Sequence, residues 1–151
     1  MNLQMEINSL KQRIAELEKQ VEQEKDFPQH GDDYWYMDGD IEVMDVEWEG
    51  RDWDQVRMSV GNVFKTKEQA EFVVEKLKVE AELRKFSRPF KEDEYNYFIQ
   101  INPSHNDIVI DSDDYHQTQG TIYFESTTIA NEATDTVGID RIKKYLFGVE
   151  E

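Results

Sequence analysis

The chain has 151 residues, which is enough for one ordinary domain or for two small modules that share a core. Its formal net charge of -17, from 34 acidic and 17 basic residues, argues against nucleic acid or an anionic membrane as a direct partner and favours a basic protein surface. The chain has no cysteine, no apolar run near the roughly 18 residues of a membrane span, and no signal-peptide pattern, so we expect a cytoplasmic protein without disulfides or thiolate metal sites.

Residues 1–26 carry an apolar repeat with alternating spacings of four and three residues, which is the period of a coiled-coil seam. The β-branched residues at the a positions and the leucines at the d positions favour a parallel two-stranded coil, and therefore a homodimer. The alternative is a single amphipathic helix folded back on its own domain, because three heptads are marginal alone. Pro28 is expected to end the helix within the segment Lys25–Pro28. The seam residues are Leu3, Ile7, Leu10, Ile14, Leu17 and Val21.

Residues 27–90 are predicted to form a first module of strands followed by a helix. Tyr34–Tyr36 and Ile41–Trp48 have strand character, and Met37–Asp40 between them is typical of an Asp-Gly hairpin turn. Ile41, Val43, Val46 and Trp48 line one face if a bulge near Met44 absorbs the break in alternation. A further strand is expected over Trp53–Val60.

The helix of this module is predicted to begin after Thr66, an N-cap whose capping box Gln69 completes, and to end near Arg84–Phe86. It would lie across the sheet as a two-layer α+β unit. The expected apolar stripe consists of Ala70, Val73, Val74, Leu77 and Ala81.

Several residues of this region and of the C-terminus recur in one order in a known group of proteins. They are Tyr34-Trp-Tyr36, Trp53-Asp54, Arg57, Gly61-Asn-Val-Phe64, Thr66, Glu68, Ala70-Glu71, Leu77, Leu83, Arg141-Ile-Lys-Lys-Tyr145 and Phe147-Gly148. In this order the chain resembles small acidic accessory proteins from phages and prophages of Gram-positive bacteria. The resemblance lends no catalytic residues. It implies a phage accessory protein of the kind that often acts on host factors, including defence systems.

Residues 91–151 are predicted to form a second, divergent module, because Gly120–Phe124 repeats Gly61–Phe64 at an offset of about 60 residues. We expect strands over Tyr95–Ile101, Ile108–Ile110 and Thr121–Phe124, a turn at 102–107 and a loop at 111–114. Ser126 would cap a short helix ended by Gly138, and Asp140 would cap a final helix ended by Gly148. The predicted fold class is therefore α+β, with an N-terminal coiled-coil helix and two related small β-sheet-plus-helix modules.

The acidic segment 32–54 is the candidate partner-binding site, since it holds ten acidic residues and one basic residue, Arg51. Alternate residues of a strand lie roughly 6.6 Å apart on one face, so carboxylates there can form a row of charges. Trp35, Trp48 and Trp53 could supply aromatic anchors between these carboxylates. The alternative is a solvated face over an aromatic core, with Trp48 pointing inward. Arg51 and Arg57 are expected to be salt-bridge partners and not ligand contacts. The candidate binding residues are Asp38, Asp40, Glu42, Asp45, Glu47, Glu49, Asp52 and Asp54, with Trp53 as an aromatic anchor.

No metal, cofactor or catalytic site is predicted. The segment Asp38–Glu49 is similar to a calcium loop, but Val43 stands where such a loop needs glycine. The group of Asp111, Asp113, Asp114 and His116 matches no defined metal site, and Gly61–Thr66 lacks the second glycine of a phosphate loop. Because no nucleophile or acid and base pair stands out either, the chain is not expected to be an enzyme.

The functional hypothesis is a phage-encoded, dimeric inhibitor of a host defence protein, of the anti-CRISPR or anti-restriction type. Its carboxylates would occupy a basic, nucleic-acid-binding surface and pair with arginines and lysines that normally hold phosphates. One alternative is a protein that sequesters a nucleotide immune signal, with Arg51 and Arg57 on its phosphates. Another is a structural or assembly protein of a phage.

Overall fold

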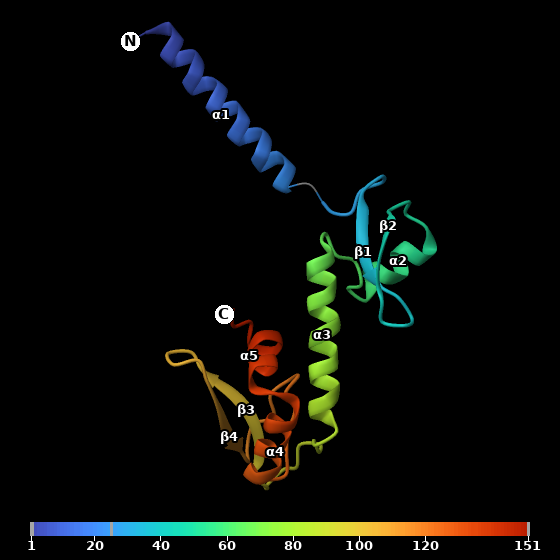
Figure 1. Ribbon diagram of the computed structural model, residues 1–151, viewed down its shortest axis with the longest axis vertical. Coiled ribbons are helices and arrows are strands. Elements are labelled where there is room, and N and C mark those ends of the chain that lie inside the picture. Colours follow the sequence, from blue (N-terminus) through green and yellow to red (C-terminus); the bar gives the residue numbers. More distant parts are fainter. Residues whose placement is uncertain (1, 25, 151) are drawn as a thin grey trace.

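The computed structural model describes residues 2–24 and 26–150. In this part of the chain it has five helices and two small antiparallel sheets of two strands each, so the predicted α+β class is confirmed (Figure 1). In chain order the elements are α1 (Leu3–Glu24), β1 (Asp33–Met37), β2 (Val43–Glu47), α2 (Asp52–Ser59), α3 (Lys67–Arg84), β3 (Asn96–Asn102), β4 (Asp107–Asp113), α4 (Thr127–Val137) and α5 (Ile139–Phe147).

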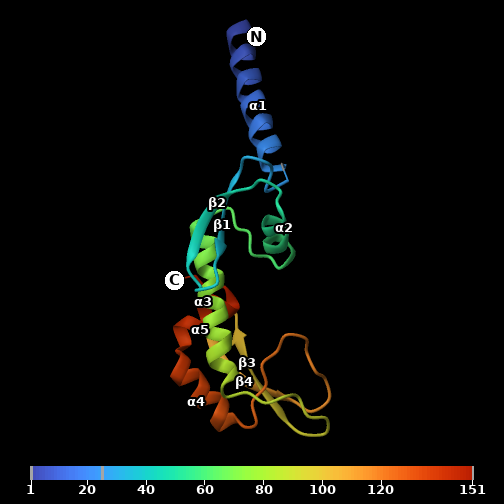
Figure 2. The same cartoon turned by 90° about the vertical axis from the view of Figure 1, so that its right-hand side faces the viewer.

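Helix α1 confirms the predicted N-terminal helix and projects away from the rest of the molecule in both views (Figures 1 and 2). Its six seam residues are all exposed, from 44% for Leu17 to 74% for Leu3. The helix is therefore not folded back on its own domain, and pairing with a second copy stays a prediction. Lys25, the first residue of the predicted helix stop, lies outside the described residues.

Strands β1 and β2 pair in a regular register, in which Tyr34 lies opposite Val46 and Tyr36 lies opposite Met44. The predicted bulge near Met44 is therefore wrong. The sheet needs none, because Val46 lies on the Tyr34 side and Val43 on the other side, so the apolar residues of β2 do not share one face. Residues on the Tyr34 side meet α2, and Val43 on the other side lies next to α3.

Residues 52–59 form helix α2, so the predicted strand over Trp53–Val60 is wrong. The deciding contact is made by Asp54, the third residue of the helix, whose Oδ2 accepts hydrogen bonds from the backbone N–H groups of Glu49 and Arg51. This carboxylate satisfies donors that a helix start otherwise leaves without a partner. Over only eight residues the apolar spacing does not distinguish a helix from a strand.

Helix α3 begins as predicted, because the backbone N–H of Gln69 donates to Thr66 Oγ1 at 3.2 Å. The expected single stripe is wrong in its second half, where Leu77 and Ala81 are exposed. The buried residues are Ala70, Val74, Val79 and Leu83. At 3.6 residues per turn, the nine residues from Ala70 to Val79 are about two and a half turns, so the helix buries nearly opposite sides in its two halves.

The two halves of α3 have different partners. Its first half packs on β1 and β2, while Val79 and Leu83 enter a core with residues of α4 and α5. Figures 1 and 2 show α3 running from the first sheet to the second part of the molecule. The buried residues of that core are Val79, Leu83, Phe124, Ala130, Ala133, Val137 and Ile142.

Strands β3 and β4 confirm the second predicted hairpin, with Asn102 paired to Asp107 across the turn. Asp111–Asp113 continue β4, so the loop expected there begins only after Asp113. Thr121–Phe124 form no strand in the described chain. Only Phe124 pairs, through a bridge to Tyr97, and Phe64 makes the same kind of bridge to Trp35.

The ends of the last two helices follow the predicted caps with one exception. Ser126 caps α4 by accepting from the N–H of Ile129, Gly138 ends it, and Gly148 ends α5 in a left-handed conformation. Asp140 is not the cap of α5, because Gly138 directly precedes the first helical residue, Ile139. None of the helices in the described ranges has the length and apolar character that crossing a membrane requires.

Candidate protein-binding surface

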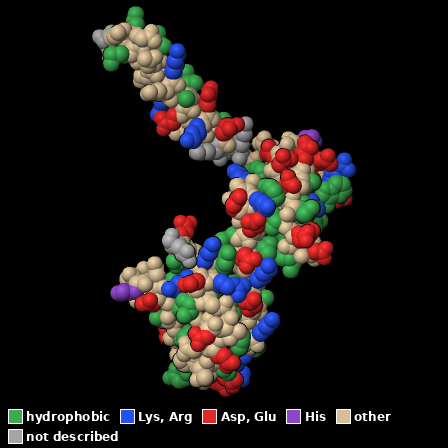
Figure 3. Space-filling model, in the orientation of Figure 1, with side chains coloured by type: hydrophobic (Ala, Val, Ile, Leu, Met, Phe, Trp, Pro, Cys, Tyr) green, Lys and Arg blue, Asp and Glu red, His purple; other side chains and the backbone are tan. Residues whose placement is uncertain are grey.

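The acidic residues of the β1–β2 hairpin and of the turn into α2 form an exposed surface, called here the acidic hairpin surface. Acidic side chains lie over this part of the molecule in Figure 3. Asp38 is only partly exposed, because its Oδ1 accepts from the N–H groups of Asp40 and Glu42 at 2.9 Å each. The exposed predicted residues are Asp40, Glu42, Asp45, Glu47, Glu49 and Asp52.

Most of these carboxylates have no partner in the described chain. Glu49 pairs with Arg51 at 2.6 Å, which confirms the predicted salt-bridge role of that arginine. The side chains of Asp40, Glu42, Asp45, Glu47 and Asp52 make no hydrogen bond or ion pair with any described residue. The acidic hairpin surface is therefore charged and largely unneutralised within the chain itself.

Asp33 also belongs to the acidic hairpin surface, although it was not among the predicted binding residues. It is exposed, makes no ion pair among the described residues, and lies directly opposite Glu47 in the sheet. Like charges in directly opposed positions destabilise an antiparallel pair. The acidic run in the sequence includes Asp33, but only the strand register shows that it faces Glu47.

Asp54 is not part of the exposed surface, which corrects its predicted place there. Its side chain is fully buried and accepts a hydrogen bond from the Tyr34 hydroxyl at 2.5 Å. Arg57 donates to the same hydroxyl at 2.8 Å and lies 4.0 Å from the carboxylate, as a salt-bridge partner. Asp54 therefore joins α2 to β1 and is not available to a binding partner.

The same contacts shift two pKa values in opposite directions. Burial alone raises the pKa of Asp54, but the hydrogen bonds from Tyr34, Glu49 and Arg51 and the charge of Arg57 outweigh it, so the pKa lies below 3.8. Burial, followed by the hydrogen bond to Asp54, raises the pKa of the Tyr34 hydroxyl above 10.0. The pair is thus a neutral phenol donating to a carboxylate.

The three tryptophans occupy different environments. Trp48 is 9% exposed and packs edge-on against Tyr34 at a ring distance of 5.8 Å, so it belongs to the core. Trp35 is partly buried, with the ammonium of Lys67 5.8 Å from its ring. Trp53 is 48% exposed, and the guanidinium of Arg51 lies 5.1 Å from its ring. Of the three, Trp53 is the one that offers a surface anchor.

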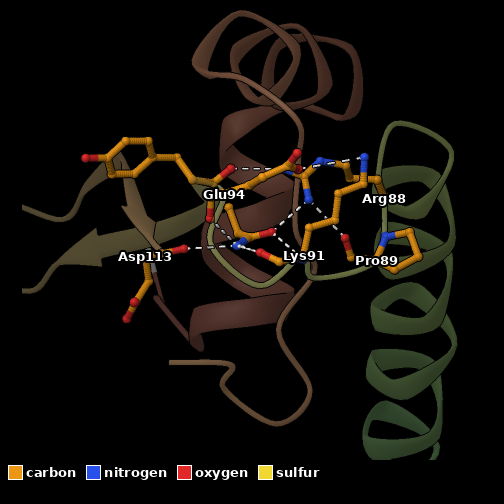
Figure 4. A network of polar contacts seen from close by, with 7 residues as sticks. Arg88, Pro89, Lys91, Glu94 and Asp113 are labelled. Carbon is orange, nitrogen blue, oxygen red and sulfur yellow. Dashed lines mark hydrogen bonds and ion pairs between the residues drawn. The ribbon is translucent and has the colours of Figure 1, made fainter. Parts of the chain in front are cut away.

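A polar network in the second part of the molecule, which the sequence did not predict, surrounds the buried Asn96 (Figure 4). Its Oδ1 accepts from Arg88 Nη1 at 2.7 Å and from the N–H of Lys91 at 2.8 Å. Its Nδ2 donates to the carbonyl groups of Lys91, Glu94 and Asp113. The amide group is satisfied by the chain itself, so this network holds a loop to β4.

The acidic group near His116 is a turn in this structure. Asp113 Oδ1 accepts from the N–H groups of Tyr115 and His116 at 2.8 Å each, and these bonds lower the pKa of Asp113. Within the described ranges, no three His, Asp or Glu side chains are grouped so that they could hold a metal ion.

No protein-family model matches the chain, and neither does any curated protein or solved structure.

Proposed function

We propose that this protein is an acidic binding protein that occupies a basic, nucleic-acid-binding surface on another protein. One observation carries the proposal. Six exposed carboxylates of the acidic hairpin surface have no neutralising partner among the described residues. These are Asp33, Asp40, Glu42, Asp45, Glu47 and Asp52. A partner rich in arginine and lysine would supply the missing positive charge.

The mechanism we propose is competition. Carboxylates form short, charge-assisted hydrogen bonds with the arginines and lysines that otherwise hold phosphates. The net charge of -17 would also speed the encounter with a basic partner at low salt. Trp53, next to Asp52, supplies the kind of aromatic anchor that is common at the centre of protein interfaces.

The concrete form of this function is inhibition of a host defence protein of the CRISPR or restriction type in the cytoplasm of the host cell. The support is the resemblance to phage accessory proteins, together with the dependence of RNA-guided nucleases on arginines that contact nucleic acid. A protein that covers such arginines would block target binding without any chemistry of its own.

Pairing of α1 with a second copy is part of the proposal. The six exposed seam residues leave one whole stripe of α1 without cover in the described chain. A parallel coil would bury this stripe and present two acidic hairpin surfaces from one dimer, which raises avidity for a partner with two basic sites.

Two related modules behind this helix, the second divergent from the first, also belong to the proposal. Each part has a hairpin whose first strand forms a bridge, Trp35 to Phe64 and Tyr97 to Phe124, followed by a capped helix. The alanine four residues after each cap, Ala70 or Ala130, is fully buried. These matches support a common origin of residues 27–90 and 91–151.

The test is a pull-down with the tagged protein from a nuclease-treated bacterial lysate at about 0.05 M and about 0.5 M salt, since exposed ion pairs are screened as salt rises. We expect a nucleic-acid-binding protein that is recovered at low salt, lost at high salt and eluted by added duplex DNA. The variant Asp45→Asn, Glu47→Gln, Glu49→Gln, Asp52→Asn should lose it. The control Asp114→Asn, Glu125→Gln, Glu132→Gln, Asp135→Asn removes equal charge from the second module and should retain it.

Equal capture by both quadruple variants would refute competition through the acidic hairpin surface. The nucleotide-sequestering alternative has less support from the contacts, because Arg51 is paired with Glu49 and Arg57 with Asp54. If both variants lose the partner equally, net charge alone explains capture, and a structural or assembly role becomes the better proposal.

A further inference from the structure

An open groove of about 750 Å³ lies between the two parts of the molecule. Its walls are the tip of the β1–β2 hairpin, the first half of α3 and the end of α5. Figure 1 shows the hairpin on one side of α3 and α5 on the other. The apolar lining is Ile41, Val43, Phe72, Val74 and Tyr145.

The groove exists because α3 changes its buried side. Ala70 and Val74 face the first sheet, whereas Val79 and Leu83 face the core on nearly the opposite side of the helix. Phe72 lies on the same side of α3 as Val79 and Leu83, but about two turns earlier, where α5 covers this side only in part. It packs on Tyr145 at a ring distance of 5.1 Å and stays 37% exposed. Phe72 therefore gives the groove a partly exposed apolar floor.

Ile41, at the tip of the hairpin, is held in an unusual conformation. Its φ is +65°, in the left-handed region that β-branched residues avoid, and its side chain is 52% exposed. Glycine or asparagine at position 41 would adopt this conformation with less strain than isoleucine. The fold thus keeps an exposed aliphatic side chain over the groove at a position where it does not serve the core.

The charges around the groove are mainly negative. Four glutamates and two lysines line it: Glu42, Glu68, Glu71, Glu75, Lys67 and Lys144. Lys67 lies 3.7 Å from Glu71, and Lys78, outside the groove lining, lies 3.2 Å from Glu75, so these two glutamates are paired. Glu42 and Glu68 make no ion pair with any described residue and carry the negative charge of the rim. An occupant with apolar side chains flanked by lysine and arginine complements both the floor and the rim.

We propose that this groove binds an amphipathic, basic helix of the partner protein. Residues 67–75 of α3 span about 12 Å, enough for about two turns of a docked helix. Its apolar side chains would pack between Ile41 and Phe72, as in other helix-in-groove complexes. The inference rests on the proposed function in so far as the helix belongs to the same basic partner.

The experiment uses a fluorescent helical peptide of about 18 residues, with leucines on one face and lysines on the other, and a sister peptide with glutamates in place of the lysines. Binding to the chain of 151 residues is measured by anisotropy at about 0.15 M salt. We expect the lysine peptide to bind and the glutamate peptide not to bind.

Matched variants locate the binding. Ile41→Asn should weaken the lysine peptide about tenfold, as loss of an interface anchor does, while Val60→Asn removes an exposed valine outside the groove lining and should change little. Glu68→Lys should weaken it more than Glu132→Lys, which makes the same charge change on α4. Ile41→Asn should also keep or raise the melting temperature, because it relieves strain, so lost binding cannot be assigned to unfolding.

Three results would overturn the proposal: no binding of the lysine peptide, equal binding of the glutamate peptide, or equal effects of the groove variants and their controls. The acidic quadruple variant separates this proposal from the proposed function, because its four positions do not line the groove. If peptide binding depends on Ile41 but the quadruple variant still captures the partner, the groove proposal is supported and the proposed function is not. The reverse pattern would refute the groove and keep the proposed function.

Discussion

Substitution of Asp54 by asparagine tests whether this residue is structural. In the native protein Oδ1 accepts from the Tyr34 hydroxyl, and Oδ2 accepts from the N–H groups of Glu49 and Arg51. Asparagine keeps the shape but replaces one acceptor oxygen with an NH₂ donor and removes the charge. If the NH₂ group faces Tyr34, the buried hydroxyl proton loses its acceptor. If it faces the backbone, two N–H groups lose theirs.

The expected cost follows from these contacts. Two bonds to a charged acceptor become bonds to a neutral one, which loses about 1 kcal/mol each, and a buried donor without a partner adds about 1–3 kcal/mol. Since Arg57 is partly exposed and can be hydrated, we expect a total loss of about 3 kcal/mol in the free energy of unfolding. In the Tyr34→Phe background the hydroxyl is absent, so Asp54→Asn should cost about 1–2 kcal/mol less.

Urea unfolding followed by tryptophan fluorescence measures this, because all three tryptophans lie in residues 35–53 and report on the part of the fold around Asp54. Protein concentration must be equal for all variants, since dimerisation would add to the apparent stability. The control is Asp45→Asn, an exposed carboxylate without a partner, which should change stability by less than about 0.5 kcal/mol.

The dependence on pH has a definite sign. The pKa of Asp54 is lower in the folded protein than the value of 3.8, so its stabilising effect is complete well above pH 3.8 and is lost as the pH falls through the folded-state pKa. The wild type and Asp54→Asn should therefore become similar in stability at low pH. A loss below about 0.5 kcal/mol at neutral pH, or simple additivity with Tyr34→Phe, would refute this account of the network.

Three further outcomes are expected. Ile14→Asp places a charge in the α1 seam and should convert a dimer into a monomer in sedimentation equilibrium without changing tryptophan fluorescence; a wild type that is already monomeric would contradict the coiled-coil proposal. Asn96→Ala should cost about 2–4 kcal/mol by circular dichroism in urea, because it removes the bonds of Asn96 to Arg88 and to four backbone groups, whereas the exposed Asn131→Ala should be near neutral. Thr66→Ala removes the α3 cap and should cost about 1 kcal/mol in the same measurement.

The sequence predicted best the features that depend on neighbouring residues. Thr66 and Ser126 cap their helices by bonding the N–H three residues later, a pattern that is visible within four residues of sequence. Gly148 ends α5 at φ +66°, a conformation in which glycine carries little strain. In these places the local chemistry and the fold agree, so no tertiary information was needed.

The predictions that failed depend on distant contacts. Asp54 has the same residue type as Asp52 two positions earlier, yet one is buried under Tyr34 and the other is exposed without a partner. Nothing in the local pattern separates them, because the contact joins residues 20 positions apart. The strand prediction for α2 failed for a related reason: the inward-turned carboxylate of Asp54 also accepts from the N–H groups of Glu49 and Arg51 and so fixes the start of the helix.

The path of α3 explains both a failed prediction and the groove. A helix that packs against one neighbour has one buried stripe, but α3 passes from the first sheet to the core of α4 and α5. The pair Val79 and Leu83 is therefore buried about half a turn around the helix from the pair Ala70 and Val74. A fragment of residues 91–151 alone would lack Val79 and Leu83, which fill that core. The two parts of the molecule therefore share one helix, and the groove beside α3 is where we propose that a partner helix binds.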